Sequence, residues 1–270
     1  MNRMSVSELR GYQQICGSNG AIMVIACDQR GGIRSLLAAD KAGQAAVTDA
    51  MLGDVKADVT RYLAAHAPCI LLDPICAVPR VVEEAALPRD VALLIGLDAS
   101  GYDTDAAGHY KSRLAPGITA PRVRELAGTG GKLMVYLRSD HASANGHNTN
   151  IISRCIADFA AEDLLLVVEF LAYPLPGETP GACAAVTAMA GSVPWPVLSA
   201  GVDHETFVGQ VEIAMANGAS GVIAGRSLWK DCVSLDRGTQ RRLLETRAVP
   251  RLREIQAILA RYPRPLSRAA

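Results

Sequence analysis

Seven short apolar segments recur along this chain of 270 residues, separated by stretches that have room for helices and loops. Segments that are apolar on both faces and alternate with helical stretches are typical of strands in a buried parallel sheet. The pattern therefore predicts an α/β protein built on one parallel sheet. The segments are AIMVIACDQ (21–29), CILLDP (69–74), VALLIGLD (91–98), KLMVYLRSD (132–140), LLLVVEFLAY (164–173), WPVLSAG (195–201) and GVIAGR (221–226).

Four of the intervening stretches carry clear helix signals. The first is amphipathic and ends before Pro68, the second opens with Asn148 and Thr149 as N-cap candidates, and the third ends on Asn-Gly. In the last, Pro250 predicts a kink or a split, because proline lacks the backbone N–H that a helix interior uses. The ranges are 45–67, 148–163, 204–218 and 239–262, the last being the expected C-terminal helix.

Polar residues gather where the apolar segments end, as Asp28, Asp98 and Glu169 illustrate. This pattern favours a TIM-type (β/α) barrel, which carries its active site at the carboxyl ends of its strands and often binds phosphate after the last two. The last two segments end in SAG and AGR, whose small residues let backbone N–H groups approach an anion. No GxGxxG follows the first segment, so a dinucleotide-binding fold is not expected.

The stretch PLPGETPGACAAVTAMAGSVPWP (174–196) has room for only one helix and two loops. The usual eightfold pattern needs a further strand here, so the spacing predicts a barrel that is one strand short. Such a barrel either narrows or leaves two strand edges exposed. The length suits a single domain over 1–270, with an N-terminal extension at 1–20.

Charge and cysteine content argue against several classes of function. Lys and Arg number 27 and Asp and Glu also number 27, so no basic excess favours nucleic-acid binding. There is no secretory signal and no apolar run of 18 residues, so no membrane partner is expected. The seven cysteines and five histidines match no metal-binding spacing, so we expect no metal and no cofactor. These features predict a reduced, cytoplasmic protein with a small-molecule partner, and a homo-oligomer is compatible with them.

Two arginines and one glutamate are the first chemical candidates. Arg30 and Arg226 each follow a strand end, where a guanidinium can grip a phosphate through paired hydrogen bonds. The alternative for each is a helix cap or a surface ion pair. Glu169 interrupts an apolar strand, where burial raises a carboxyl pKa and suits acid–base catalysis. Its alternative is a structural glutamate held by a cation.

Lys132 is the best-placed amine for a Schiff base, because it is the one lysine that opens a predicted inward-facing strand. The alternative is charge pairing with Glu169 or Asp28 across the barrel. Lys56 lies within a helix, where a solvated or snorkelling side chain is expected. His141 and His147 fall in the polar stretch SDHASANGHN, which is consistent with an active-site loop. Asp28 is a stronger candidate than any histidine, because it ends a strand beside Gln29 and Arg30.

The ordered motifs ACDQRGGIRSLL, CILLDP, GYDTD, GGKLMVYLRSD, VVEFLAY, VLSAGVDHETF and GASGVIAGRSLW resemble the class I aldolases of the tagatose-bisphosphate aldolase family. The sulfofructose-phosphate aldolases are similar. The resemblance covers nearly the whole chain, and the order of the motifs is its specific part. It implies a TIM barrel that cleaves a ketose phosphate through a Schiff base.

The resemblance also implies roles for individual residues. Glu169 corresponds to the acid/base, and Asp28 and Lys132 correspond to positions that line the site. The positions that correspond to phosphate or sulfonate binding are Gln29, Arg30, Ser199, Gly201, Gly225 and Arg226.

One departure from the family concerns the nucleophile. The family's Schiff-base lysine lies on strand six, in a segment resembling ADLYKVEMP, and no such segment occurs here. The chain is therefore expected to lack the fifth helix and the sixth strand. One interpretation is an active aldolase in which Lys132 supplies the amine. The alternatives are a sugar-phosphate-binding relative without lyase activity, or a degraded relative that keeps only the fold.

Overall fold

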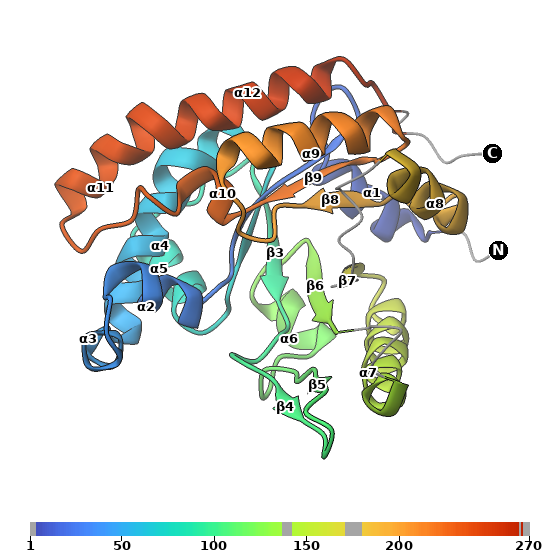
Figure 1. Cartoon of the computed structure of the whole chain (residues 1–270), viewed down its shortest axis with the longest axis horizontal. Helices are drawn as coiled ribbons and strands as arrows, with labels where there is room; N and C mark the ends of the chain where they lie inside the picture. Colours follow the sequence, from blue (N-terminus) through green and yellow to red (C-terminus); the bar gives the residue numbers. More distant parts are fainter. Residues whose placement is uncertain (1–3, 137–141, 171–179, 265, 267–270) are drawn as a thin grey trace.

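The computed structural model of this chain describes residues 4–136, 142–170, 180–264 and 266, arranged as Figure 1 shows. A curled sheet of seven parallel strands forms the centre, and most of the helices lie around the outside of the curl.

All seven predicted strands are present, and each pairs in parallel with its neighbours. Their order is β7-β6-β3-β2-β1-β9-β8, so most strands lie beside the strand that precedes them in the chain. This order is the one that successive right-handed crossovers generate in a barrel. The strands are β1 (Ile22–Cys27), β2 (Cys69–Leu72), β3 (Ala92–Gly96), β6 (Gly130–Val135), β7 (Leu165–Phe170), β8 (Pro196–Leu198) and β9 (Gly221–Ala224).

β7 and β8 are the two ends of the sheet, and they do not pair with each other within the described residues. The described part of the chain between them holds one helix, α8 (Pro180–Ala190). The sheet is therefore a curled half-barrel of seven strands. The prediction of a TIM-type barrel that lacks one helix and one strand at this point is confirmed for the described residues.

The helices vary in length, and the longer ones include three of the four that the sequence predicts most clearly. The described helices are α1 (Val6–Gln14), α2 (Gly31–Leu37), α3 (Lys41–Ala46), α4 (Asp49–Leu63), α5 (Ala77–Glu83), α6 (Ala120–Glu125), α7 (Ala142–Ala161), α8, α9 (His204–Ala216), α10 (Arg226–Trp229), α11 (Arg237–Leu243) and α12 (Val249–Ala260). The fourth predicted helix corresponds to α11 and α12. A 3-10 turn (Ala64–His66) follows α4.

The structure confirms one predicted helix boundary and corrects another. The split predicted at Pro250 is confirmed, because α11 passes into a π-helical turn (Leu244–Ala248) before α12 begins. The predicted start at Asn148 is wrong, since α7 begins at Ala142. The buried Asn148 amide instead accepts from the Ser112 N–H at 2.9 Å and donates to the Tyr110 carbonyl at 3.0 Å. Residues distant in sequence satisfy it, which local spacing does not reveal.

The N-terminal extension contributes to the core rather than trailing from it. Ser5 and Glu8 form a capping box that starts α1. Tyr12 of α1 and the following Ile15 are buried with Val24 and Leu94 in an apolar cluster. Alternate residues of the strands supply this cluster, so it fills the concave side of the sheet. The concave side is therefore apolar towards the amino ends of the strands, and its polar groups lie at their carboxyl ends.

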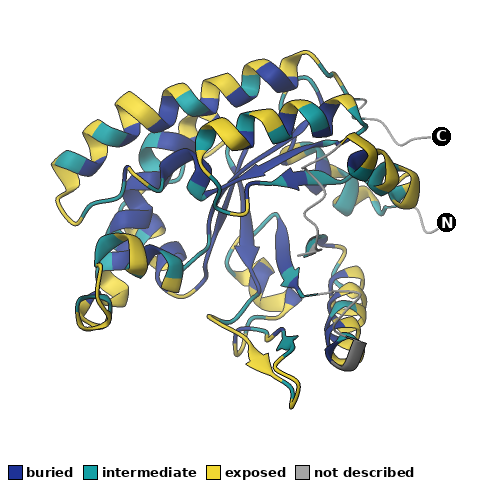
Figure 2. Ribbon diagram, in the orientation of Figure 1, coloured by how far each residue is buried: buried dark blue, intermediate teal, exposed yellow. Residues whose placement is uncertain are grey.

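The other face of the sheet is buried under the helices. Met23, Ile25 and Leu133 point outward into a larger cluster that also includes Phe207 and Leu252 from α9 and α12. Figure 2 shows the strands buried and the outer helix surfaces exposed. Burial on both faces explains why the strands read as continuous apolar runs.

A short hairpin, β4 (Asp103–Thr104) and β5 (Tyr110–Lys111), follows β3 and projects beside α7. The ring of Tyr136, just after β6, packs edge-on against the rings of Tyr102 and Tyr110, with centroids 5.3 and 5.1 Å away. Among the described residues, no helix combines the length and apolar character that a membrane crossing requires.

Candidate active site

Strand register places two candidate residues on the concave face. Lys132 of β6 lies opposite Val167 of β7, and Glu169 lies two residues further along β7, opposite Met134. Side chains alternate along a strand, so Lys132 and Glu169 share a face with the inward-pointing Val167. The two charged groups therefore lie at the carboxyl end of the concave apolar cluster.

Three carboxylates surround the Lys132 ammonium. Its Nζ lies 3.2 Å from Oδ2 of Asp28 and 3.6 Å from Oδ2 of Asp98, and it forms a close ion pair with Glu169. Asp28 follows β1 and Asp98 follows β3, so the cluster joins four strand ends. Gly96 of β3 makes room for it, since a Cβ there would lie 3.3 Å from the Cβ of Asp28. The charge pairing offered above as the alternative for Lys132 is present.

The three carboxylates keep the amine of Lys132 protonated. Burial alone would lower the pKa of Lys132, but the charges of Asp28, Glu169 and Asp98 outweigh burial and raise that pKa well above its ordinary value. Burial raises the pKa of Asp98 to about 7, although Lys132 and the Met134 N–H, which donates to Asp98 Oδ1 at 2.7 Å, oppose the rise. A lysine held in this way is a hydrogen-bond donor, and it becomes a nucleophile once a neighbouring carboxylate takes its proton.

A second set of predicted residues meets at the ends of β8 and β9. The Gly225 N–H donates to the Ser199 hydroxyl at 3.2 Å. Gly201 has a φ of +82°, and a Cβ there would lie 3.0 Å from the guanidinium carbon of Arg226. Glycine is favoured at this position both by the left-handed backbone and by the close approach of the arginine.

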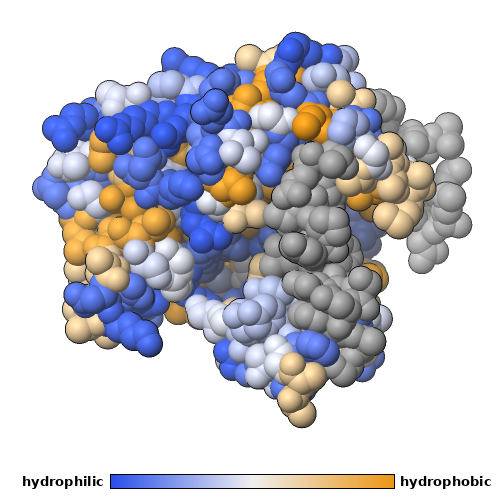
Figure 3. All heavy atoms as spheres, in the orientation of Figure 1, coloured by the Kyte–Doolittle hydropathy of each residue, from blue (hydrophilic) through white to orange (hydrophobic). Residues whose placement is uncertain are grey.

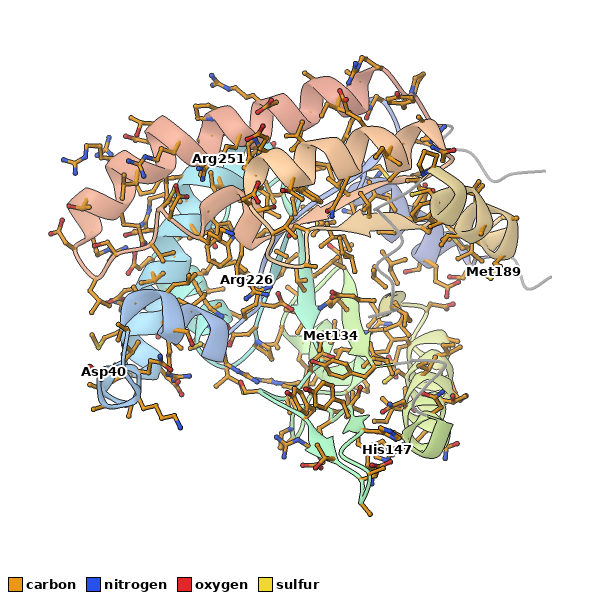
Figure 4. All side chains as sticks on the ribbon, viewed as in Figure 1. Asp40, Met134, His147, Met189, Arg226 and Arg251 are labelled. Atoms are coloured by element: carbon orange, nitrogen blue, oxygen red, sulfur yellow. The ribbon has the colours of Figure 1, made fainter. Side chains whose placement is uncertain are left out.

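The guanidinium of Arg226 has no hydrogen-bond or ion-pair partner among the residues that the structure describes. Its guanidinium lies close to Gly201 and to Gly32 of α2. Figure 4 shows Arg226 near the centre of the molecule, in the neighbourhood of Met134. In Figure 3 this face is hollowed between the α2–α3 region and the β4–β5 hairpin, and hydrophilic side chains line part of the hollow. An unpaired guanidinium in this position is suited to bind an anion.

Arg30 is tied into the same end of the sheet. Its Nε donates to the Ser100 hydroxyl at 2.7 Å and its Nη2 to the Asp98 carbonyl at 3.3 Å. Its Nη1 lies 4.0 Å from Oδ1 of Asp73, is buried, and has no hydrogen-bond partner in the described chain. Gln29 is similar, since its Nε2 donates to Asp28 at 2.8 Å while its Oε1 is buried without a partner. Both side chains therefore keep unused hydrogen-bonding capacity.

The expectation that Lys56 is solvated or snorkelling is wrong. The side chain is fully buried and forms a close ion pair with Asp73 at the end of β2. Burial alone would raise the pKa of Asp73, but Lys56 lowers it below its ordinary value. A signal was available in the sequence, because Lys56 shares the apolar stripe of α4 with Leu52 and Val59 at helical spacing.

The interpretation of SDHASANGHN as an active-site loop is wrong for its described part, because residues 142–148 belong to α7. His141 lies outside the described residues. His147 belongs to α7, and its Nε2 lies 2.9 Å from the carbonyl of Ser112. No metal-holding group of three or more His, Cys, Asp or Glu side chains occurs within the described ranges.

Comparison with curated proteins relates the chain to aldolases. No protein-family model matches it. The tagatose 1,6-diphosphate aldolase of Staphylococcus aureus (strain JH9) is 28% identical over 170 residues, which cover 63% of this chain and 50% of the relative. The chain thus spans about half the length of the curated relatives it matches.

Solved structures show the same fold. An archaeal fructose 1,6-bisphosphate aldolase matches with a TM-score of 0.58 and 15% identity, covering 93% of this chain and 98% of that chain. Fructose-bisphosphate aldolase from Plasmodium falciparum, in complex with TRAP and a small-molecule inhibitor, matches with a TM-score of 0.65 and 10% identity, covering 98% of each chain. The fold is therefore that of the (β/α) barrels. By sequence, the chain is a distant homologue of tagatose 1,6-diphosphate aldolase.

Proposed function

We propose that this chain binds a ketose phosphate at the carboxyl end of its curled sheet and cleaves a carbon–carbon bond of it, with Lys132 as the Schiff-base amine. The observation that carries the proposal is the concave cluster in which Lys132 touches Glu169 and Asp28. The distant homology to a tagatose bisphosphate aldolase supports the reaction class.

The proposed binding of the phosphate uses the second set of residues. Arg226 supplies an unpaired cation, and the missing side chain of Gly201 lets its guanidinium lie against the backbone there. Ser199 and Gly225 are joined by a hydrogen bond beside it. We call the region at the carboxyl ends of β1, β8 and β9, where these residues lie, the mouth of the site. Arg30 and Gln29 add donors and acceptors from the β1 side of the same mouth. A sulfonate shares the tetrahedral arrangement of oxygen atoms of a phosphate monoester but carries a single negative charge, so it is the alternative anion.

The proposed chemistry begins with a proton transfer. The Lys132 ammonium passes a proton to a carboxylate of the cluster, and the free amine adds to the ketone carbon. Loss of water leaves an iminium ion. A carboxylate, Asp28 or Glu169, then takes the proton of the hydroxyl on the carbon that will leave, and the O–H electron pair forms the C=O bond of the aldehyde. The carbon–carbon bond breaks, and its electron pair moves into the iminium to form an enamine. An aldehyde leaves, and the remaining enamine is protonated and hydrolysed to a ketone.

A retro-aldol assay combined with chemical trapping tests this proposal. The protein is incubated with tagatose or fructose 1,6-bisphosphate, triose phosphate release is followed by a coupled enzyme, and borohydride is added to reduce any imine. Mass mapping is expected to find the adduct on Lys132 and to lose it in Lys132→Ala. Failure to trap an adduct, or an adduct that persists in Lys132→Ala, contradicts the proposed nucleophile.

A second candidate function is sugar-phosphate binding without cleavage. The observation that favours it is the carboxylate cage, which raises the pKa of Lys132 and so opposes formation of a free amine. Calorimetric titration with the same sugar phosphates distinguishes the two functions. Binding that depends on Arg226 and Arg30, with no product and no adduct, supports the second candidate, and absence of binding to every sugar phosphate tested excludes it.

A further inference from the structure

Lys56 takes no part in the chemistry proposed above, yet it is among the most deeply buried large side chains of the described chain. It lies on α4, outside the strands, and its aliphatic stem crosses the core to reach the carboxyl end of β2. Burying an ammonium is costly unless the group is paired and hydrogen-bonded. A buried lysine next to a binding mouth therefore calls for a physical explanation.

Lys56 satisfies two oxygens at the strand ends. Its Nζ pairs with Oδ2 of Asp73 and donates to the backbone carbonyl of Asp28 at 3.4 Å. The other carboxylate oxygen of Asp73 accepts from the N–H groups of Ile75 and Cys76 at 3.0 and 2.8 Å. Both carboxylate oxygens of Asp73 thus have hydrogen-bond partners, Lys56 on one side and the N–H groups of the following turn on the other.

This pairing of Asp73 determines how much charge Arg30 can offer. The Nη1 of Arg30 lies 4.0 Å from Oδ1 of Asp73, beyond hydrogen-bond distance, and makes no hydrogen bond to the described residues. The side chain of Arg30 is 9% exposed. Asp73 therefore faces two cations, Lys56 and Arg30, and the three groups together carry one net positive charge. Without Lys56, the carboxylate would neutralise Arg30.

We propose that Lys56 is a positioning residue for the anion-binding mouth: it neutralises Asp73, so that the buried and unpartnered Nη1 of Arg30 is available to the phosphate of a substrate. The proposal rests on the anion site of the proposed function. It concerns a charge balance and not a contact with the ligand, because Lys56 reaches the mouth only through Asp73 and the Asp28 carbonyl.

If Lys56 acts through the local charge, phosphate affinity should follow that charge across variants of Lys56 and Asp73, which a purely structural role does not predict. Lys56→Met leaves Asp73 ionised beside Arg30, and the local charge falls from +1 to 0. Asp73→Asn raises it to +2 and keeps an oxygen to accept from Ile75 and Cys76. The double variant Lys56→Met/Asp73→Asn restores +1 and leaves no unpaired buried charge. If Lys56 and Asp73 only support the fold, both single variants should weaken binding, and the double variant should bind no more tightly than Lys56→Met.

The test is calorimetric titration of the full chain with inorganic phosphate and with dihydroxyacetone phosphate. Lys56→Met is expected to bind at least about tenfold more weakly than wild type, since one unit charge near the ligand is lost. Asp73→Asn is expected to bind as tightly as wild type or more tightly, and the double variant is expected to recover most of the affinity. Asp58→Asn is the matched control, because Asp58 is a buried, ion-paired carboxylate on the same helix whose partners are Arg61 and Arg237.

The experiment distinguishes three causes of a negative result: a variant that fails to fold, the absence of an anion site, and the absence of a role for Lys56. Thermal unfolding monitored by circular dichroism identifies variants that fail to fold. If Lys56→Met is among them, Asp73→Asn and the double variant still decide, because weakened binding in both overturns the inference. Equal affinity of folded Lys56→Met and wild type also overturns it. Wild-type protein that binds neither probe overturns the anion site itself, and with it the proposed function, whereas wild-type binding without the charge pattern overturns only the role of Lys56.

Discussion

The ammonium of Lys132 on β6 forms an ion pair with the carboxylate of Glu169 on the neighbouring strand β7, and Asp28 and Asp98 complete a ring of acids around it. The same carboxylates that can accept the lysine's proton also stabilise that proton on the amine. The reactivity proposed for Lys132 therefore depends on how many of these acids are ionised.

Removal of one acid should make Lys132 a better nucleophile. Asp98→Asn deletes one of the charges that raise the pKa of Lys132, so its free amine should form at a lower pH. The rate of borohydride trapping with dihydroxyacetone phosphate should rise with pH in both proteins, and the profile of the variant should lie at lower pH. Each unit by which the pKa falls raises the free-amine fraction about tenfold. Coincident profiles for the two proteins would show that Asp98 does not control the amine.

Asp98 should also give the stability of the fold a characteristic pH dependence. Its carboxyl has an ordinary pKa of 3.8 and a folded pKa of about 7, raised chiefly by burial. Between these values the folded state holds more protons than the unfolded state, so this contribution to stability falls as pH rises from about 4 to 7. Asp98→Asn should match wild type near pH 4 and become more stable than it by pH 8, with an upper bound of about 4 kcal/mol.

Urea unfolding at pH 4, 6 and 8 measures this difference. The exposed Asp90→Asn is a suitable control, since loss of a surface carboxyl should change the free energy of unfolding little at any pH. A variant whose advantage stays constant, or shrinks, between pH 4 and 8 would mean that Asp98 is not held protonated in the folded state.

Loss of the Arg226 guanidinium should weaken anion binding. It has no partner within the described residues, so Arg226→Met removes a free cation from the mouth without leaving a buried carboxylate unpaired. Phosphate affinity should fall by about tenfold to a hundredfold, corresponding to charge-assisted hydrogen bonds of about 1.5–3 kcal/mol. Calorimetry measures the change, and Arg253→Met, on the exposed side of α12, serves as the charge-matched control. Equal affinities of the two variants would place the anion elsewhere.

Gly130 on β6 should be intolerant of any side chain. A Cβ there would overlap the backbone carbonyl of Leu165 on β7, which cannot move without breaking the pairing of the two strands. Gly130→Ala should therefore lower the free energy of unfolding by more than about 2 kcal/mol. Gly209→Ala provides the contrast, because nothing lies within 4 Å of its Cβ position in α9, and it should stabilise the protein by about 0.5–1 kcal/mol. Thermal and urea unfolding measure both, and a mild effect at Gly130 would indicate a loosely paired β7.

Much of the architecture could be predicted because the strands are buried on both faces. Runs such as the one around Ile25 and the one around Leu94 have no polar alternation, and only a parallel sheet covered on both sides accommodates them. The short helices α2, α5 and α6 went unpredicted, because six or seven residues give too few turns to establish a period. The β4–β5 hairpin is two residues long on each side and carries no strand signal.

Several residues of the candidate site could be predicted from the sequence, but the ion pairs that set its net charge could not. Strand ends identify Asp28 and Glu169 as neighbours, because parallel strands present their carboxyl ends at one edge. Lys132 opens its predicted strand, and its inward-facing position made charge pairing with these two residues one of its two interpretations. Asp98 also ends a strand, but its contact with Lys132 depends on β3 lying beside β6, which is a property of the sheet order. The pairing of Lys56 with Asp73 depends on how α4 packs against β2, and no spacing along the chain encodes that distance.

The half-barrel has a consequence for how the site is kept in alignment. In a closed ring each strand is aligned by two neighbours, whereas within the described chain β7 is held in the sheet by β6 alone. A slip of one residue in that single pairing would turn Glu169 away from Lys132 and towards the helices. The fit of Gly130 against Leu165 opposes such a slip. The contact of Glu169 with Lys132 thus depends on the backbone contact between Gly130 and Leu165, so the reactivity proposed for Lys132 depends on strand alignment as well as on side-chain identity.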